Sequence, residues 1–220
     1  ASAGTCVRVL EELVLCDEGI GDTGVEILVR DSNIPPNGGL GSITHLDLSR
    51  NDIGCLYLSG DEAVQSLEEH QHVWSSLLSA VSHDIHSLLL AGNGLGPQGA
   101  AIICDHMAQW SHVAHLSLSG CFLADNGAVE LSIGLESCAS ITHLDLSSNN
   151  LTDIGAEALA ESVPELSCQG LRILLSRNAI GPDGACALVR ALSATLEFVE
   201  LQKNLIDADD VAILAQVLGA

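Results

Sequence analysis

A chain of 220 residues, 47% of them hydrophobic, is long enough for one sizeable core and too apolar to be disordered as a whole. Its 29 acidic and 7 basic residues give a formal net charge of −22. Such a field repels nucleic-acid phosphates and anionic membranes, which excludes both as expected partners, and it attracts basic protein segments.

The acidic residues gather where basic residues are missing. No Lys or Arg occurs between residues 51 and 171, whereas fifteen acidic residues do. Acidic side chains that coat solvated helix faces for solubility explain this pattern, and so does a salt-adapted source. A surface that docks a basic partner is the alternative.

The eight cysteines predict a reducing compartment rather than disulfides or a zinc site. No CxxC pair occurs, and several cysteines resemble small buried hydrophobic residues. No apolar run reaches membrane-spanning length, and no signal peptide is present. We therefore expect no membrane insertion and an intracellular location, first of all the cytoplasm, with a cytoskeletal or organellar assembly as the alternative.

Seven segments of the chain share one pattern of aliphatic residues, beginning near residues 10, 43, 85, 113, 141, 170 and 196. Each carries apolar residues in alternation, as in Ile141-Thr-His-Leu144-Asp-Leu146. This alternation predicts a short strand with one apolar face. A turn residue follows three positions later, and in chain order it is Glu18, Asn51, Asn93, Cys121, Asn149, Asn178 and Asn204.

Each turn is followed by an aliphatic residue and then by an apolar stretch that predicts a helix. A glycine opens five of these stretches, as Gly155 does before Ala156, Ala158 and Leu159. Neighbouring strands lie about 4.8 Å apart, whereas packed helices need roughly 8–10 Å. The stack of segments must therefore curve, with the strands on its concave side.

The turn residue is expected to hold neighbouring segments together. An Asn side chain both donates and accepts, so it satisfies backbone groups that would otherwise be buried unpaired. Cys121 offers only weak hydrogen bonds, so we expect the fourth segment to be tied less well.

Two segments are longer than the others and predict insertions near residues 32–39 and 55–84. The first contains Pro35 and Pro36, which exclude helix. The second contains Ser59-Gly-Asp-Glu62, a capping-box pattern that predicts a long helix through Trp74 and Leu78. A binding element and a tolerated surface insertion are equally good interpretations of both.

The pattern L-x-x-L-x-L-x-x-N/C-x-L is that of leucine-rich repeats. The spacing of 28, 28, 29 and 26 residues from Asn93 to Asn204 resembles the ribonuclease-inhibitor-like subfamily. The resemblance implies an α/β solenoid: a right-handed horseshoe of about seven repeats in one domain over residues 1–220, with parallel strands inside and helices outside. Neither end carries a polar cap, so we expect a fragment of a longer chain, or ends covered by further repeats or other subunits.

No catalytic, cofactor or metal site is expected. Gly94-Leu-Gly96-Pro-Gln-Gly99 matches a dinucleotide fingerprint, but the same register recurs in other repeats, so the repeat explains it. Ser147, His143 and Asp145 share one strand, where alternate residues lie about 6–7 Å apart. That separation is too large for a hydrogen-bonded triad, and we expect the protein not to be an enzyme.

The register places three rows of side chains on the concave strands. The first row contains Glu12, His45, Ser87, His115, His143, Arg172 and Phe198, and the second contains Asp47, Ser117, Asp145 and Glu200. From these rows and the third we predict a partner-binding face made of His45, Asp47, Ser49, His115, Ser117, His143, Asp145, Ser147, Arg172, Phe198, Glu200 and Gln202.

The histidines leave several interpretations open. His115 and His143 should be lateral neighbours, with Asp145 on the strand of His143. They are consistent with weak metal binding, with pH-dependent binding, with contact to a partner and with a solvated surface.

The leading functional hypothesis is a protein-interaction scaffold that binds a partner, with a basic segment, on its concave face. The resemblance implies a second hypothesis, a regulatory protein similar to ribonuclease inhibitors or to activators of the Ran GTPase. A third is a structural subunit of a large assembly such as an axoneme or an organellar complex.

Overall fold

The computed structural model describes residues 10–32, 40–54, 62–162, 170–191 and 196–218. Strands and helices alternate along all of these ranges. The strands are β1 (Glu12–Val14), β2 (His45–Asp47), β3 (Ser87–Leu89), β4 (His115–Ser117), β5 (His143–Asp145), β6 (Leu171–Leu174) and β7 (Leu196–Glu200). The helices are α1 (Gly21–Ser32), α2 (Glu62–Ala80), α3 (Gly96–Met107), α4 (Ala124–Glu136), α5 (Asp153–Ser162), α6 (Pro182–Arg190) and α7 (Ala208–Leu218), and a 3-10 turn covers Leu40–Ser42.

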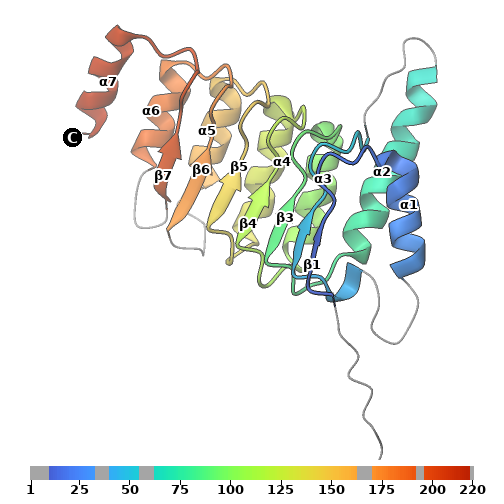
Figure 1. Cartoon of the computed structure of the whole chain (residues 1–220). Helices are drawn as coiled ribbons and strands as arrows, with labels where there is room; N and C mark the ends of the chain where they lie inside the picture. Colours follow the sequence, from blue (N-terminus) through green and yellow to red (C-terminus); the bar gives the residue numbers. More distant parts are fainter. Residues whose placement is uncertain (1–9, 33–39, 55–61, 163–169, 192–195, 219–220) are drawn as a thin grey trace, which may run out of the picture.

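The seven strands form one parallel sheet in sequence order, β1 to β7. Each strand with the turn and helix that follow it forms one coil, and we number the coils 1 to 7 by their strands. Figure 1 shows the strands side by side along one face and the helices along the other, in a curved stack. The fold is therefore the α/β solenoid that the repeat predicts.

The core is a pair of aliphatic columns between the sheet and the helices. The middle residue of each inner strand is buried, as Leu88, Leu116 and Leu144 are, and helix residues such as Leu131 and Leu159 close the layer from the other side. All five side chains are at most 2% exposed. One coil cannot bury its own apolar face, so each is stabilised by its two neighbours.

The two predicted insertions are only partly within the described residues. The Pro35–Pro36 loop lies outside them, as does Ser59 of the expected capping box. The predicted long helix is α2, in which Trp74 and Leu78 are both about 1% exposed. Its C-terminal half therefore packs on the core as the helices of the shorter coils do.

Turn asparagines connect coils 2, 3, 5, 6 and 7 to the coil that precedes each of them. Asn149 is fully buried; its Oδ1 accepts the N–H groups of Cys121 and Leu123 at 2.8 and 3.3 Å, and its Nδ2 donates to Leu118 O at 2.8 Å. Asn51, Asn93 and Asn178 are used in the same way. These bonds satisfy backbone groups at the turns, where no strand partner is present.

Aspartates at helix starts make a second set of connections. They bond to the coil that follows, whereas the asparagines bond to the coil that precedes. Asp153 Oδ1 accepts the N–H groups of Gly181 and Gly184 in the next coil at 2.7 and 2.9 Å. Asp125 accepts from Thr152 and Gly155 in the same way. This set of contacts was not predicted from the sequence.

Glycine is required where these helices approach one another. A Cβ on Gly184 would lie 2.7 Å from Asp153 Oδ1 and 2.8 Å from Asp153 Cα. Gly155 and Gly184 therefore let their coils come close enough for the preceding aspartate to reach the backbone.

Candidate functional site

Strand pairing brings the predicted concave rows together in the predicted order. His45 pairs with Ser87, Ser87 with His115, and His115 with His143. The row continues through Arg172 and Phe198. This row thus has one side chain on each of the six adjacent strands β2 to β7.

Neighbouring planar side chains in this row stack face to face. The rings of His115 and His143 have centroids 4.4 Å apart and planes inclined by 23°. The guanidinium carbon of Arg172 lies 4.4 Å from the centre of the Phe198 ring, a cation–π contact. The row from β4 to β7 therefore contains two stacked pairs, His115 with His143 and Arg172 with Phe198.

Two further histidines, His86 and His112, stack beside the first row, and the repeat pattern did not indicate them. His86 stacks between His45, at 6.0 Å, and His112, at 5.5 Å. Both added residues precede a strand, at positions where other repeats carry Thr142 or Ser140, so the repeat gives no signal for them. Five imidazoles consequently gather at the amino ends of β2 to β5.

The environment of His143 disfavours its charged form. Its pKa lies below the ordinary value, mainly because burial penalises the imidazolium, and then because His115 and Arg172 bring positive charge near it. Its Nδ1 lies 3.0 Å from Thr142 Oγ1. His143 thus belongs to a hydrogen-bonded, stacked array rather than to a catalytic pair with Asp145.

The second row holds carboxylates in fixed positions. Asp47 Oδ1 accepts the N–H of Ser49 at 2.9 Å, and Asp145 Oδ1 accepts the N–H of Ser147 at 3.0 Å. Glu200 Oε1 accepts the Ser176 hydroxyl at 2.8 Å. The backbone and serines of the third row therefore orient the negative charges of this face.

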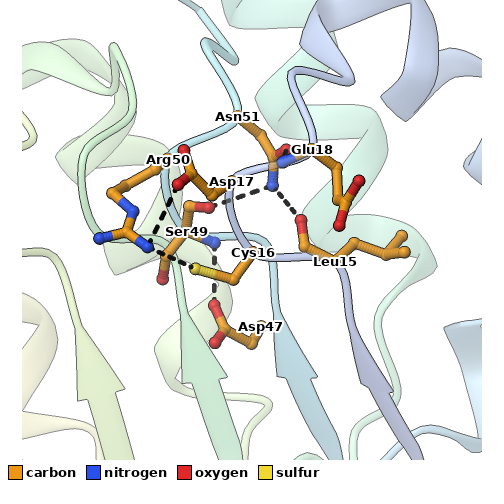
Figure 2. A network of polar contacts seen from close by, with 8 residues as sticks. All are labelled: Leu15, Cys16, Asp17, Glu18, Asp47, Ser49, Arg50 and Asn51. Carbon is orange, nitrogen blue, oxygen red and sulfur yellow. Dashed lines mark hydrogen bonds and ion pairs between the residues drawn. The ribbon is translucent and has the colours of Figure 1, made fainter.

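Figure 2 shows how the turn beside this row is built where coils 1 and 2 meet. Asn51 Nδ2 donates to Leu15 O at 2.6 Å and to Ser49 O at 3.2 Å. Arg50 lies 3.5 Å from both Asp17 Oδ2 and Cys16 Sγ. Arg50 is thus paired with an acidic residue of its own chain.

The concave face offers hydrogen bonding and charge, and its described residues do not assemble a metal cluster. Within the described ranges, no group of three or more His, Cys, Asp or Glu is arranged to hold a metal ion. A search of the same ranges for a helix with the length and apolarity needed to cross a membrane finds none.

The seven-coil architecture, with parallel strands, turn asparagines and outer helices, defines an α/β leucine-rich-repeat solenoid. The family model described as "Leucine Rich repeat" matches residues 42–54 and 137–160, which include β2 and β5. The chain thus has the fold of a leucine-rich-repeat solenoid, and the curvature of such solenoids creates extended concave binding surfaces.

Among solved structures, the chain is similar to the leucine-rich repeat-containing protein LegL7 from Legionella pneumophila. The two share 19% sequence identity with a TM-score of 0.43, over 88% of this chain and 67% of that chain. A comparison with curated proteins returns no match.

Proposed function

We propose that the protein is an interaction scaffold that binds a basic segment of a partner protein on the concave face of its sheet. The supporting observation is the row of oriented carboxylates, Asp47, Asp145 and Glu200, on the strand face. A carboxylate already held by the backbone loses less conformational freedom when a cation pairs with it. The twelve residues predicted from the sequence remain the candidate contacts.

Electrostatics favours a basic partner over an acidic one. The chain carries a net charge of −22, which raises the encounter rate of a cationic segment and lowers that of an anionic one. Arg172 lies on the same face, but it stacks on Phe198, and Glu200 is on the next strand. The surface of β2 to β5 is thus the more negative part.

Charge-matched variants test this proposal. One variant neutralises the concave row (Asp47→Asn, Asp145→Asn and Glu200→Gln), and the other neutralises three exposed helix residues (Glu136→Gln, Glu157→Gln and Glu161→Gln). Both lose the same charge, so a difference between them reports position rather than net charge. We expect captured partner and affinity for an oligo-lysine peptide to fall strongly with the concave variant only. Equal losses with both variants would contradict the proposal.

We also propose that the chain is one solenoid domain of the ribonuclease-inhibitor-like type, working in the cytoplasm. Helices of 12, 13, 10 and 9 residues in α3 to α6 support the subfamily, since they require long repeats. Free cysteines at positions 16, 104, 121, 138 and 186 support a reducing compartment. Localisation of a tagged chain in cells tests the second point.

A further inference from the structure

One pocket lies apart from the concave rows, at the turns that lead from the strands to the helices. It has a volume of about 260 Å³ and is lined by residues of the coil 2 turn, helix α2, the start of helix α3 and the coil 4 turn. Pockets that hold small molecules begin at about 300 Å³, so this pocket matches a ligand of about one or two rings.

The wall of this pocket differs in composition from the rest of the chain. The chain contains only two Trp, two Phe and one Tyr, yet both Trp74 and Phe122 line this pocket. Leu95 and Pro97 add apolar surface. Although the net charge of the chain is −22, none of the described residues that line the pocket is charged. The wall therefore favours a neutral ligand with a flat apolar part over an ion.

Trp74 brings an unused hydrogen-bond donor to this wall. The residue is 1% exposed, and its Nε1 has no hydrogen-bond partner among the described residues. A Cβ on Gly54 would lie 2.6 Å from Trp74 Nε1 and 2.6 Å from Gly94 O. The N–H end of the indole therefore lies against the part of the wall that Gly54 and Gly94 form. A buried donor without an acceptor is costly, so an acceptor atom of a ligand would stabilise the complex there.

Phe122 stands in the pocket wall with an uncommon backbone conformation. Its φ is 59°, and Gly19, Asp52 and Asn150, each one residue after its own turn position, have φ angles of 61°, 57° and 60°. Gly, Asp and Asn tolerate this left-handed region, whereas a bulky aromatic residue rarely adopts it. The residue is 68% exposed, so its ring gains little from packing within the chain. Such conformations cluster at ligand sites, and a ligand in the pocket would give the ring a packing partner.

The start of helix α3 does not suit a phosphate group, although the G-x-G-x-x-G pattern falls there. Phosphates at helix starts are held by free backbone N–H groups. Pro97 has no N–H, and the N–H of Gly96 donates to Cys121 O at 2.9 Å. The N–H of Gly99 donates to Leu95 O at 3.1 Å. A nucleotide is therefore a poor match for this pocket.

We propose that this pocket binds a small, uncharged aromatic molecule whose carbonyl or ring-nitrogen acceptor bonds to the Trp74 N–H. The ring of the ligand packs against Phe122 and Pro97, and the side-chain amides of Gln71 and Gln98 bond to its remaining polar atoms. The site is separate from the concave face, so this inference goes beyond the proposed function and does not depend on it.

Three small probes of similar size, benzamide, benzoate and toluene, test the inference by NMR of the indole N–H signals. The Trp110→Phe variant assigns the two signals. We expect benzamide to shift the Trp74 signal and not the Trp110 signal, with a dissociation constant of about 1 mM. Benzoate should bind at least about tenfold more weakly, because its carboxylate would be buried without a cation. Toluene should also bind more weakly, because it has no acceptor.

The opposite outcomes overturn the inference. They are a Trp74 signal that stays in place up to the solubility limit of benzamide, equal shifts at both tryptophans, and benzoate or toluene binding as tightly as benzamide.

Substitutions then locate the site. Phe122→Asn removes the exposed ring, and asparagine already occupies the same conformation at Asn150, so this variant should fold. We expect its affinity for benzamide to fall by about fivefold. Leu205→Asn removes an apolar side chain of similar exposure, 67%, in coil 7 and should leave the affinity unchanged. A melting curve checks folding, and Gln98→Leu, at another exposed position of the pocket, replaces Phe122→Asn if that variant does not fold. Full affinity in the pocket variant overturns the inference.

Discussion

At the scale of single residues, the turn asparagines are expected to contribute strongly to the free energy of unfolding, because one side chain satisfies several buried backbone groups. Asn149 makes four bonds: with the N–H groups of Cys121 and Leu123, and with the carbonyls of Leu118 and Ser147. Its replacement by alanine leaves buried backbone groups without partners, and each such group costs about 1–3 kcal/mol.

We expect Asn149→Ala to lower the free energy of unfolding by about 3 kcal/mol or more, measured by urea denaturation. The control is Asn204→Ala in coil 7, where the asparagine is half-buried and bonds to Ile180 N–H, Leu175 O and Leu201 O. Water can replace those partners more easily, so the control should lose less. A loss at position 204 as large as at 149 would argue against burial as the cause.

His143 provides a residue-scale prediction about pH. Its pKa is lowered by burial first and by His115 and Arg172 second, so the folded protein takes up this proton at a lower pH than the unfolded chain. The stability associated with neutral His143 is therefore present above the ordinary pKa of about 6.5 and is lost as the pH falls through the lowered value. NMR titration of the imidazole should show a midpoint below the ordinary value.

Removing one cause should move this midpoint only part of the way back. His115→Gln deletes the neighbouring charge but leaves the burial, so we expect the pKa of His143 to rise without reaching its ordinary value. His72→Gln, on helix α2, is the matched control and should change nothing. A midpoint that does not move in His115→Gln would refute the assigned coupling.

At the scale of the repeated element, coil 4 departs from the pattern at its turn. Cys121 stands where four other inner coils carry Asn, and its thiol donates to Leu90 O at 3.2 Å. A thiol is a weak donor and a weak acceptor, whereas an amide provides strong groups of both kinds. We expect Cys121→Asn to raise the free energy of unfolding by about 1 kcal/mol.

The control for this prediction is Cys138→Asn, which places an amide at another buried cysteine. Cys138 is also buried, but it lies outside the turns, and its thiol has only long contacts, to Trp110 O at 4.0 Å and to Ser140 Oγ at 3.7 Å. A larger amide buried there should therefore destabilise the protein. Chemical denaturation of both variants gives the answer. Destabilisation by Cys121→Asn would contradict the prediction and would mean that the turn of coil 4 accommodates a thiol better than an amide.

The elements also show which parts of the fold the sequence could predict. Strand alternation, the turn asparagines and the row of His115, His143 and Arg172 were predictable because parallel pairing in a repeat carries each position onto its equivalent in the next coil. The Asp125 and Asp153 contacts were not predictable, since only some repeats carry an acidic residue there. The stacking of His86 on His112 depends on side-chain rotamers, which the pattern does not determine.

At the scale of the whole molecule, charge opposes the compact state. The described residues between 51 and 171 include many carboxylates and no Lys or Arg, and a net charge of −22 repels itself. Added salt screens this repulsion. We expect the melting temperature to rise with potassium chloride, by about 2–4 °C for each kcal/mol recovered in a protein of this size.

The charge-neutralised helix variant checks the cause of that rise. With Glu136, Glu157 and Glu161 replaced by Gln, the protein should melt at a higher temperature in low salt and respond less to added salt. The same response in both proteins would mean that salt acts through something other than repulsion among these carboxylates.

One joint of the solenoid carries neither the asparagine nor the aspartate connection, and the Cys121 thiol, which donates to Leu90 O at 3.2 Å, takes the place of the asparagine. Between coils 3 and 4, Cys121 replaces the asparagine that reaches backward, and Pro97 stands where Asp125 and Asp153 reach forward in later coils. Packing of α3 on α4 remains, as at Gly134, where a Cβ would lie 2.8 Å from Met107 Sδ. The helix layer at this joint should hold while the strand layer opens first.

We expect the hydrogen bonds between coils 3 and 4 near this turn to open more often than those between coils 4 and 5, where Asn149 is present. Amide exchange should therefore be faster for Leu90 and Gly92, which bond across the joint of coils 3 and 4, than for Leu118 and Gly120 one coil later.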